Sequence, residues 1–128
     1  EKRYIAVVAG KPSPEAGEIE MPLITDWPNR PRQKVDFESG KPSLTRYTLL
    51  SYDGAQGRSR VELRPHTGRS HQLRVHMMAV GHPILGDELY GDEASRTAAK
   101  RLLLHACELT LPHPATGAQL HLLSEPPF

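Results

Sequence analysis

The sequence has 128 residues, a length that suits one compact domain with a modest core. Its hydrophobic fraction is 38%, and no apolar run approaches the roughly 20 residues that a membrane-spanning helix needs. The one cysteine, Cys107, excludes an intrachain disulfide and agrees with a reducing compartment. We therefore expect a soluble, cytoplasmic domain without membrane association.

The net charge of +1 conceals a basic middle segment. Residues 29–74 hold ten Lys/Arg and four Asp/Glu, whereas acids outnumber bases in the segments before and after. This asymmetry favours a face that meets an anion such as RNA phosphate. A solvated surface with chance clustering of charge explains the pattern equally well.

The first elements in chain order are extended. Residues 4–10 are an apolar, β-like run, and residues 11–17 read as a loop because they contain prolines and glycine. Two prolines make residues 26–32 an exposed loop that carries arginines. Val35 and Phe37 alternate with charged neighbours and predict a short strand.

Two hairpins follow along the chain. Residues 45–52 are rich in β-formers, residues 53–57 have turn chemistry, and residues 58–64 alternate between apolar and charged. A second hairpin is predicted from residues 108–111 to residues 119–123, around a turn at residues 113–117.

The strongest helix signal lies between the hairpins. Ser70 is a plausible N-cap, the spacing of Leu73, Met77 and Val80 gives one apolar face, and Gly81 stands where a C′ residue should. A second short helix is predicted over residues 94–101. The fold class is therefore α+β: a mainly antiparallel or mixed sheet with one or two short helices, in one domain that covers residues 1–128.

Residues 64–76, RPHTGRSHQLRVH, carry the densest set of chemically active side chains. Backbone N–H groups at a helix start lack intrahelical partners, so together with Arg69 they predict an anion site. Arg74 follows the core-facing Leu73 and is placed to flank a cleft.

Two other chemistries fit this segment poorly. His66, His71 and His76 are spaced five apart, which scatters them around a helix, so no metal site is predicted. Activation of Ser70 as a nucleophile by His71 is disfavoured because neighbours in sequence rarely reach that geometry.

Several motifs together resemble one enzyme family. The string TGRSHQLRVH at residues 67–76 resembles the T-G-R-[ST]-H-Q-[IL]-R-V-H motif of RluA-family pseudouridine synthases. KRYIA at residues 2–6, HPILGDELYG at 82–91 and LLHA at 103–106 resemble further family elements in the same order. DWPNRPRQKV at residues 26–35 is most similar to the family member that modifies both large-subunit 23S ribosomal RNA and transfer RNA.

The resemblance implies the C-terminal part of a catalytic domain that isomerises uridine to pseudouridine in structured RNA, without cofactor or metal. Tyr4 matches the family tyrosine that packs on the flipped base and helps to remove the C5 proton. Arg74 matches the basic residue that pairs with the catalytic aspartate, whose ionised form a guanidinium favours. The residues expected to contact RNA are Arg30, Arg32, Lys34, Arg69 and His71.

The sequence departs from the family at one essential point. The family's catalytic aspartate lies in an H-R-L-D motif upstream of the first strand, and these 128 residues contain no such motif. We therefore expect a trimmed chain that is inactive alone. The alternatives are a non-catalytic RNA-binding module and an interaction domain for a protein partner. Asp87 is expected to satisfy backbone donors in a turn, and His82, His105 and His113 are expected to be structural.

Overall fold

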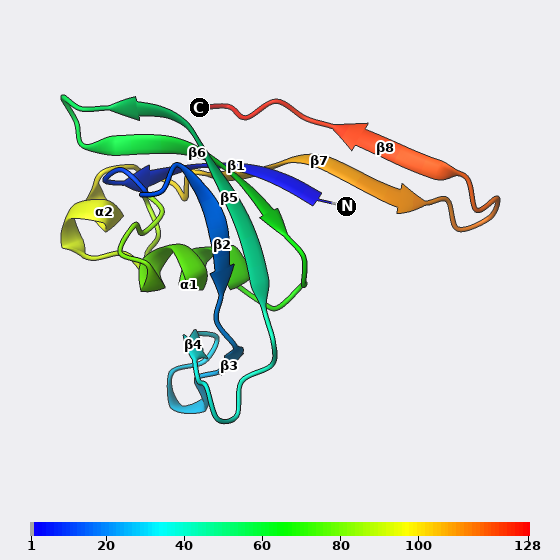
Figure 1. Cartoon of the computed structure of the whole chain (residues 1–128), viewed down its shortest axis with the longest axis horizontal. Coiled ribbons are helices and arrows are strands. Elements are labelled where there is room, and N and C mark those ends of the chain that lie inside the picture. The colour runs from blue at the N-terminus through cyan, green and yellow to red at the C-terminus, as the bar shows by residue number, and fades with distance from the viewer. Residues whose placement is uncertain (1) are drawn as a thin grey trace.

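The structure, a computed structural model, describes residues 2–128 and is built around one antiparallel sheet (Figure 1). Six strands pair in the order β2-β5-β6-β1-β7-β8. Their bounds are Lys2–Ala9 (β1), Ala16–Glu20 (β2), Leu44–Asp53 (β5), Arg58–Pro65 (β6), Leu104–Pro112 (β7) and Gln119–Leu123 (β8). Two short helices, α1 (Gln72–Ala79) and α2 (Glu93–Thr97), accompany the sheet. The predicted α+β class is confirmed.

The hairpin of β5 and β6 forms as the sequence predicts. Asp53 accepts hydrogen bonds from the N–H groups of Ala55 and Gln56, and Gly57 takes the left-handed conformation with φ of 65°. These are the turn roles for which aspartate and glycine are suited. The second predicted hairpin is also present, although β7 begins earlier than expected.

The core lies between α1 and one face of the sheet. The alternation of β1 and β6 turns Ala6, Val8, Val61 and Leu63 inward, and the helix contributes the side chains of Leu73 and Met77. Val80 does not join this apolar face, contrary to the prediction: it is the C-cap of α1 and is 36% exposed. Gly81, with φ of 88°, ends the helix as predicted.

The predicted start of the helix at Ser70 is wrong. The N-cap position is His71, in the left-handed conformation with φ of 55°, and α1 begins at Gln72. The physical reason is that the side-chain oxygen of Gln72, the first residue of the helix, accepts the Arg69 N–H. This bond holds the preceding loop in place of a cap by the Ser70 hydroxyl. Ser70 is exposed and makes no cap.

A small lobe projects from the sheet below α1 (Figure 1). It is the two-stranded hairpin of β3 (Leu23–Thr25) and β4 (Gln33–Val35), with a 3-10 turn, η1 (Trp27–Asn29), in its loop. Leu23 anchors the lobe by packing with Val75 and Tyr90. The loop prediction for residues 26–32 holds, but Phe37 lies outside the short strand and is 76% exposed. We call this hairpin the lobe.

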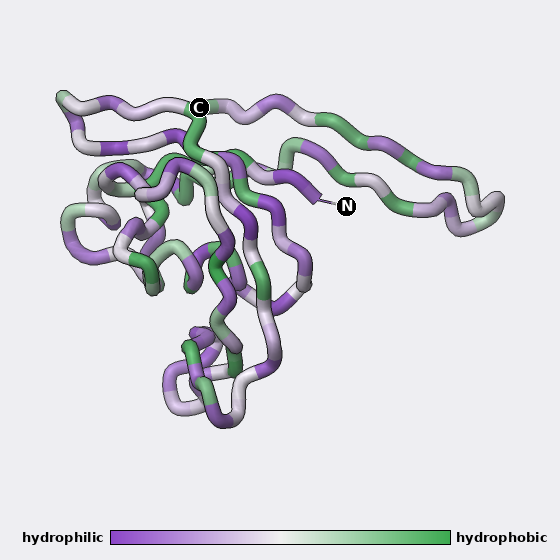
Figure 2. Tube along the Cα trace, in the orientation of Figure 1, coloured by the Kyte–Doolittle hydropathy of each residue, from purple (hydrophilic) through white to green (hydrophobic). Residues whose placement is uncertain are grey.

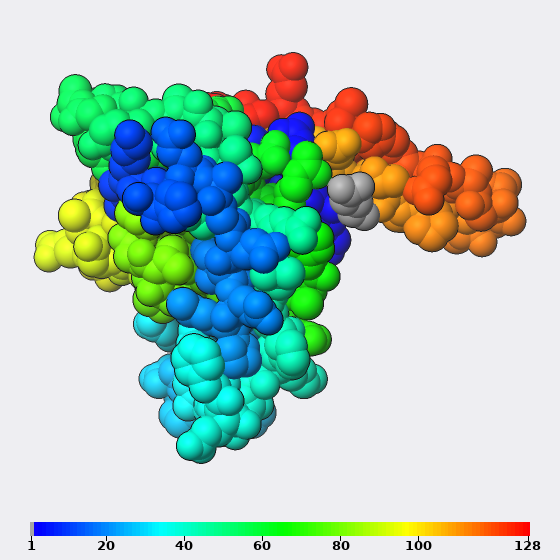
Figure 3. Space-filling model, viewed as in Figure 1, coloured from blue at the N-terminus to red at the C-terminus, as the bar shows by residue number. Residues whose placement is uncertain are grey.

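Two further boundaries differ from the prediction. β2 starts at Ala16, inside the expected loop. α2 begins one residue earlier than predicted, after its cap at Asp92, but it ends at Thr97 and is therefore shorter than residues 94–101. Figure 3 shows the lobe and the β7–β8 arm as separate protrusions from the body. Along that arm Figure 2 shows hydrophobic segments, and the side chains of Leu122 and Leu123 are exposed. Within residues 2–128, no helix has the length and apolar character to cross a membrane.

A Gly86→Ala change tests the close approach between the loop after α1 and the backbone of Arg101. A Cβ there would lie 1.9 Å from the carbonyl oxygen of Arg101, and its φ is +79°. Gly81 is a matched control, because its φ is +88° and nothing lies near its Cβ position. Both Gly→Ala changes carry the left-handed penalty of about 1–2 kcal/mol, and only Gly86→Ala adds a backbone clash. In urea unfolding Gly86→Ala should lose clearly more free energy; equal losses would contradict the packing.

Candidate active site

A pocket of about 330 Å³ opens where β1, the loop after β6 and the start of α1 meet. Ligand pockets in proteins typically begin at about this size. Apolar walls come from Tyr4, Leu73, Leu102 and Leu104. Polar groups reach it from the residues Thr67, Arg69, His71 and Arg74. We call this the candidate pocket. It brings Tyr4, Arg69, His71 and Arg74 together from separate parts of the sequence.

Tyr4 is positioned by an irregularity in the sheet. It pairs with Leu63 of β6 and Ala106 of β7, and the β1–β7 register shifts between Arg3 and Tyr4. Such bulges re-aim a side chain and recur beside active sites. The Tyr4 ring packs against the core while it also lines the pocket.

Arg74 is held by a two-bond ion pair with Asp87. Its Nε and Nη2 donate to the two carboxylate oxygens of Asp87, at 2.9 and 2.7 Å. Asp87 is fully buried and also accepts the N–H groups of Leu89 and Tyr90. The expected role of Asp87 toward turn donors is confirmed, whereas its pairing with Arg74 is not visible in the sequence.

This pair is charged throughout the neutral range. Burial raises the pKa of Asp87, but hydrogen bonds from Arg74 and from the Tyr90 and Leu89 amides outweigh that effect and hold it below its usual value. The hydrogen bond with Asp87 raises the pKa of Arg74. A fixed guanidinium therefore stands at the wall of the pocket.

Tyr90 connects the lobe with the candidate pocket. Its hydroxyl accepts the N–H of Gln33 at 2.8 Å and shares a second hydrogen bond with Nδ1 of His71, at 2.7 Å. Burial lowers the pKa of His71, and the charge of Arg74 lowers it further. Both effects favour the neutral imidazole of His71. The guanidinium carbons of Arg74 and Arg32 lie 5.2 and 5.4 Å from the Tyr90 ring centre.

A buried polar network fixes the start of α1 to the sheet. The Gln72 oxygen accepts the Thr67 hydroxyl, and the Gln72 amide donates to Thr45 Oγ1 at 3.0 Å. Thr45 donates in turn to Nδ1 of His76, whose Nε2 donates to the carbonyl of Met21 at 2.9 Å. Burial lowers the pKa of His76, which is consistent with the neutral ring that this network requires. Sequence reasoning missed these roles, since buried polar partners distant in sequence leave no periodic signal.

Comparisons with known proteins show the family of this chain. A family model described as RNA pseudouridylate synthase matches residues 1–79, more than half of the chain. The chain belongs to the RNA pseudouridylate synthase family.

The curated relatives of this pseudouridylate synthase chain include two proteins named dual-specificity RNA pseudouridine synthase RluA. The Escherichia coli K12 protein is 57% identical over 116 residues, which are 91% of this chain and 52% of that protein. The Yersinia pestis protein is 51% identical over 127 residues, which are 99% of this chain and 61% of that protein. The chain thus spans about half the length of the curated relatives it matches.

Solved structures share the fold of this pseudouridylate synthase chain. Human RNA pseudouridylate synthase domain containing 1 superposes with a TM-score of 0.83 at 32% identity, over 99% of this chain and 55% of that one. Human RNA pseudouridylate synthase domain containing 4 gives a TM-score of 0.73 at 27% identity, over 98% of this chain and 57% of that one.

The residues expected to contact RNA occupy two places in this pseudouridylate synthase chain. Arg30, Arg32 and Lys34 belong to the lobe, where Arg30 stacks on Trp27 with its guanidinium carbon 4.4 Å from the ring centre. Arg69 is at the candidate pocket, and its guanidinium donates to the carbonyl of Pro42. Of the lobe cations, Arg32 approaches the pocket, because its guanidinium packs on the Tyr90 ring as that of Arg74 does.

The expected anion site at the helix start stays a prediction for this synthase chain. The Arg69 N–H is bonded to the Gln72 side chain and is therefore not one of the free amides there. Within residues 2–128, no group of three or more His, Cys, Asp or Glu is placed to hold a metal ion.

The three histidines expected to be structural make contacts within the fold of the synthase chain. The rings of His82 and His105 bond to the Ala9 carbonyl and the Ser124 hydroxyl, respectively. His113 accepts the N–H groups of Ala115 and Thr116 in the β7–β8 turn, at 3.1 and 3.3 Å.

Asp87→Asn should destabilise this synthase chain by about 3–5 kcal/mol, because it leaves the Arg74 guanidinium without its buried counter-charge. The matched control is Asp92→Asn: Asp92 caps α2 through the Ser95 N–H, and asparagine caps about as well. The free energy of unfolding in urea measures both changes. Similar losses in the two variants would contradict the central role given to Asp87.

The stability of the synthase chain should fall in mild acid. Because the folded pKa of His76 lies below the unfolded value of about 6.5, the unfolded state binds more protons as the pH falls below that value. The free energy of unfolding should therefore be steady above about pH 7 and decrease from there toward about pH 5.5. In His76→Gln this decrease should be smaller, and His71 accounts for part of the remainder. An identical decrease in the variant would assign it to other groups.

Proposed function

We propose that the whole protein isomerises uridine to pseudouridine in structured RNA, with large-subunit ribosomal RNA, transfer RNA or both as substrates, in the cytoplasm. The observation that carries the proposal is that Tyr4 and Arg74 line one pocket, although they lie seventy positions apart in the chain. Membership of the family and the RNA pseudouridine synthases among the relatives support it.

The reaction needs no net oxidant or reductant. The bond between N1 of uracil and C1′ of ribose breaks, the base turns, and a bond from C5 to C1′ forms. C5 loses its proton and N1 gains one, so atoms and electrons balance. The target nucleotide must first leave its stack, at a cost of a few kcal/mol, and an apolar-walled pocket compensates part of that cost.

In this proposal Tyr4 contacts the flipped base and takes part in removing the C5 proton. Arg74 holds the catalytic carboxylate ionised. Two guanidinium nitrogens of Arg74 are bound to Asp87, and Nη1 makes no hydrogen bond within the part of the chain that the structure describes. That nitrogen is available to a second acid. His71 presents its Nε2 to a ligand in the pocket.

The nucleophilic carboxylate is proposed to come from outside these 128 residues, so the chain by itself is inactive. Asp87 is a poor nucleophile because it is fully buried and its oxygens accept four hydrogen bonds, from Arg74 and from two backbone amides. Arg30, Arg32 and Lys34 on the lobe, together with Arg69, are proposed to contact RNA phosphates, which position the substrate.

The competing function is an RNA-binding module without chemistry. Release of tritium from RNA labelled at C5 of uridine separates the two, because only the enzyme removes the C5 hydrogen. The whole protein should release tritium, whereas the 128-residue chain alone should not. Salt-dependent RNA binding by a whole protein that releases no tritium would favour the module.

Tyr4→Phe tests the proton-transfer role within the same assay. Removing the hydroxyl should slow release by about 10²–10⁴-fold, the usual contribution of a positioned acid or base. The matched control is Tyr52→Phe, which removes an exposed hydroxyl from the β5–β6 hairpin and should leave the rate unchanged. Equal rates for Tyr4→Phe and the wild-type protein would refute the role of Tyr4.

A further inference from the structure

A second hollow, of about 420 Å³, adjoins the candidate pocket. The walls of both contain Lys2, Pro65, Thr67 and Gly68, so the loop after β6 separates two connected depressions. If one residue of a polymer enters the candidate pocket, the backbone next to that residue would cross this loop and reach the second hollow.

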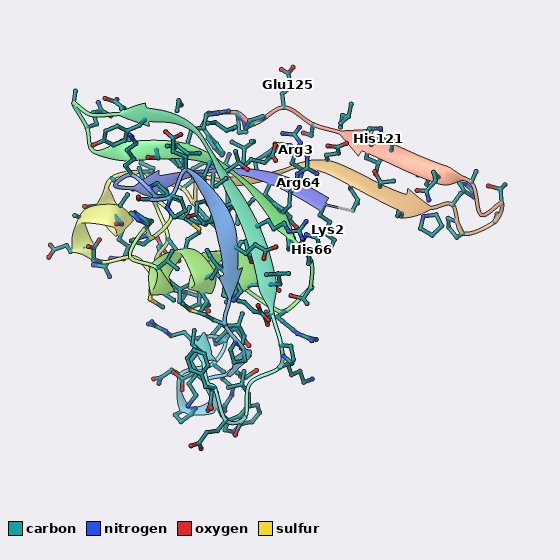
Figure 4. All side chains as sticks on the ribbon, in the orientation of Figure 1. Lys2, Arg3, Arg64, His66, His121 and Glu125 are labelled. Atoms are coloured by element: carbon teal, nitrogen blue, oxygen red, sulfur yellow. The ribbon has the colours of Figure 1, made fainter. Side chains whose placement is uncertain are left out.

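The lining of the second hollow is basic. Its titratable side chains are Lys2, Arg46, Arg64 and His66, and among residues 2–128 no Asp or Glu lines it. Figure 4 shows Lys2 and His66 close together near the ends of β1 and β6, with Arg64 beyond them. We call this depression the basic hollow.

The sheet register places two of these cations directly opposite each other. Arg46 of β5 and Arg64 of β6 are cross-strand partners, an arrangement that destabilises a sheet because like charges face each other. Two carboxylates offset this repulsion: Glu18 lies 2.6 Å from Nε of Arg46, and Glu62 lies 2.9 Å from Nε of Arg64. A locally unfavourable pair that a sequence retains marks a site of function.

Two carboxylates of the described residues contact the arginines of the basic hollow from outside its lining, and one of them, Glu62, also lies 3.7 Å from Arg3. The side chains of Lys2 and His66 make no hydrogen bond or ion pair within the part of the chain that the structure describes, and both residues are exposed. The fold makes no use of these two side chains.

We propose that the basic hollow binds a backbone phosphate of the RNA, next to the nucleotide that enters the candidate pocket. This inference rests on the proposed function for the identity of the ligand. A phosphodiester is the anion that a polynucleotide presents along its length. Arginine forks and a lysine ammonium are the groups that bind it. The site adds Lys2, Arg46, Arg64 and His66 to the RNA contacts, apart from the lobe.

The test compares Lys2→Gln with Lys100→Gln in the whole protein. Lys100 is an exposed lysine between α2 and β7, and it lines neither depression. Binding of a uridine-containing RNA stem-loop is measured over a series of salt concentrations. Each phosphate contact contributes about 0.7–0.9 to the slope of log affinity against log salt. Lys2→Gln should weaken binding and reduce the slope by about that amount, and Lys100→Gln should change neither.

The outcomes separate this site from the proposed function. Equal slopes and affinities for the two variants, while the wild-type protein still binds RNA in a salt-dependent way and converts uridine, would overturn the basic hollow alone. If the salt slope falls only in Lys2→Gln and the wild-type protein converts no uridine, the phosphate site is supported and the proposed isomerisation is overturned. The urea midpoint of Lys2→Gln should equal that of the wild type, which excludes loss of folding as the cause.

Discussion

The candidate pocket depends on one buried carboxylate. Asp87 accepts hydrogen bonds from two nitrogens of the Arg74 guanidinium and from two backbone amides, so both of its carboxylate oxygens have donors. A charge in such a position is tolerated only when its partners are fixed. Asp87 therefore fixes Arg74 from one side and the chain at Tyr90 from the other. Tyr90 in turn orients His71, so the direction of two pocket groups, Arg74 and His71, depends on Asp87.

The pocket is also built on rigid elements. Tyr4 lies in a central strand, and Arg74 lies in a helix that the Thr67–Gln72–Thr45–His76 network joins to β5. Every member of that network has a partner, which is the condition under which buried polar groups specify one arrangement. Side chains held in this way approach a ligand in a prepared geometry, with little conformational entropy left to lose.

Much of the fold could be predicted from the sequence, because its hairpins and its helix have local signals. The β5–β6 turn is an example: aspartate and glycine dictate it within five residues. The true helix start could not be predicted, since a left-handed His71 is stabilised by Gln72 and Tyr90, the latter nineteen residues away. Likewise the motif resemblance singled out Arg74, but only the three-dimensional fold shows that Asp87 is its partner. The arginine pair of the basic hollow depends on strand register, which composition does not specify.

The chain of hydrogen bonds from Gln33 through Tyr90 to His71 has a thermodynamic consequence. The Gln33 N–H belongs to the lobe, and the Tyr90 hydroxyl that accepts it also shares a hydrogen bond with Nδ1 of His71. A ligand that displaces β4 would remove one of the two hydrogen bonds of that hydroxyl. By linkage, any effect of such a ligand on binding at His71 equals the effect of binding at His71 on the affinity of the lobe.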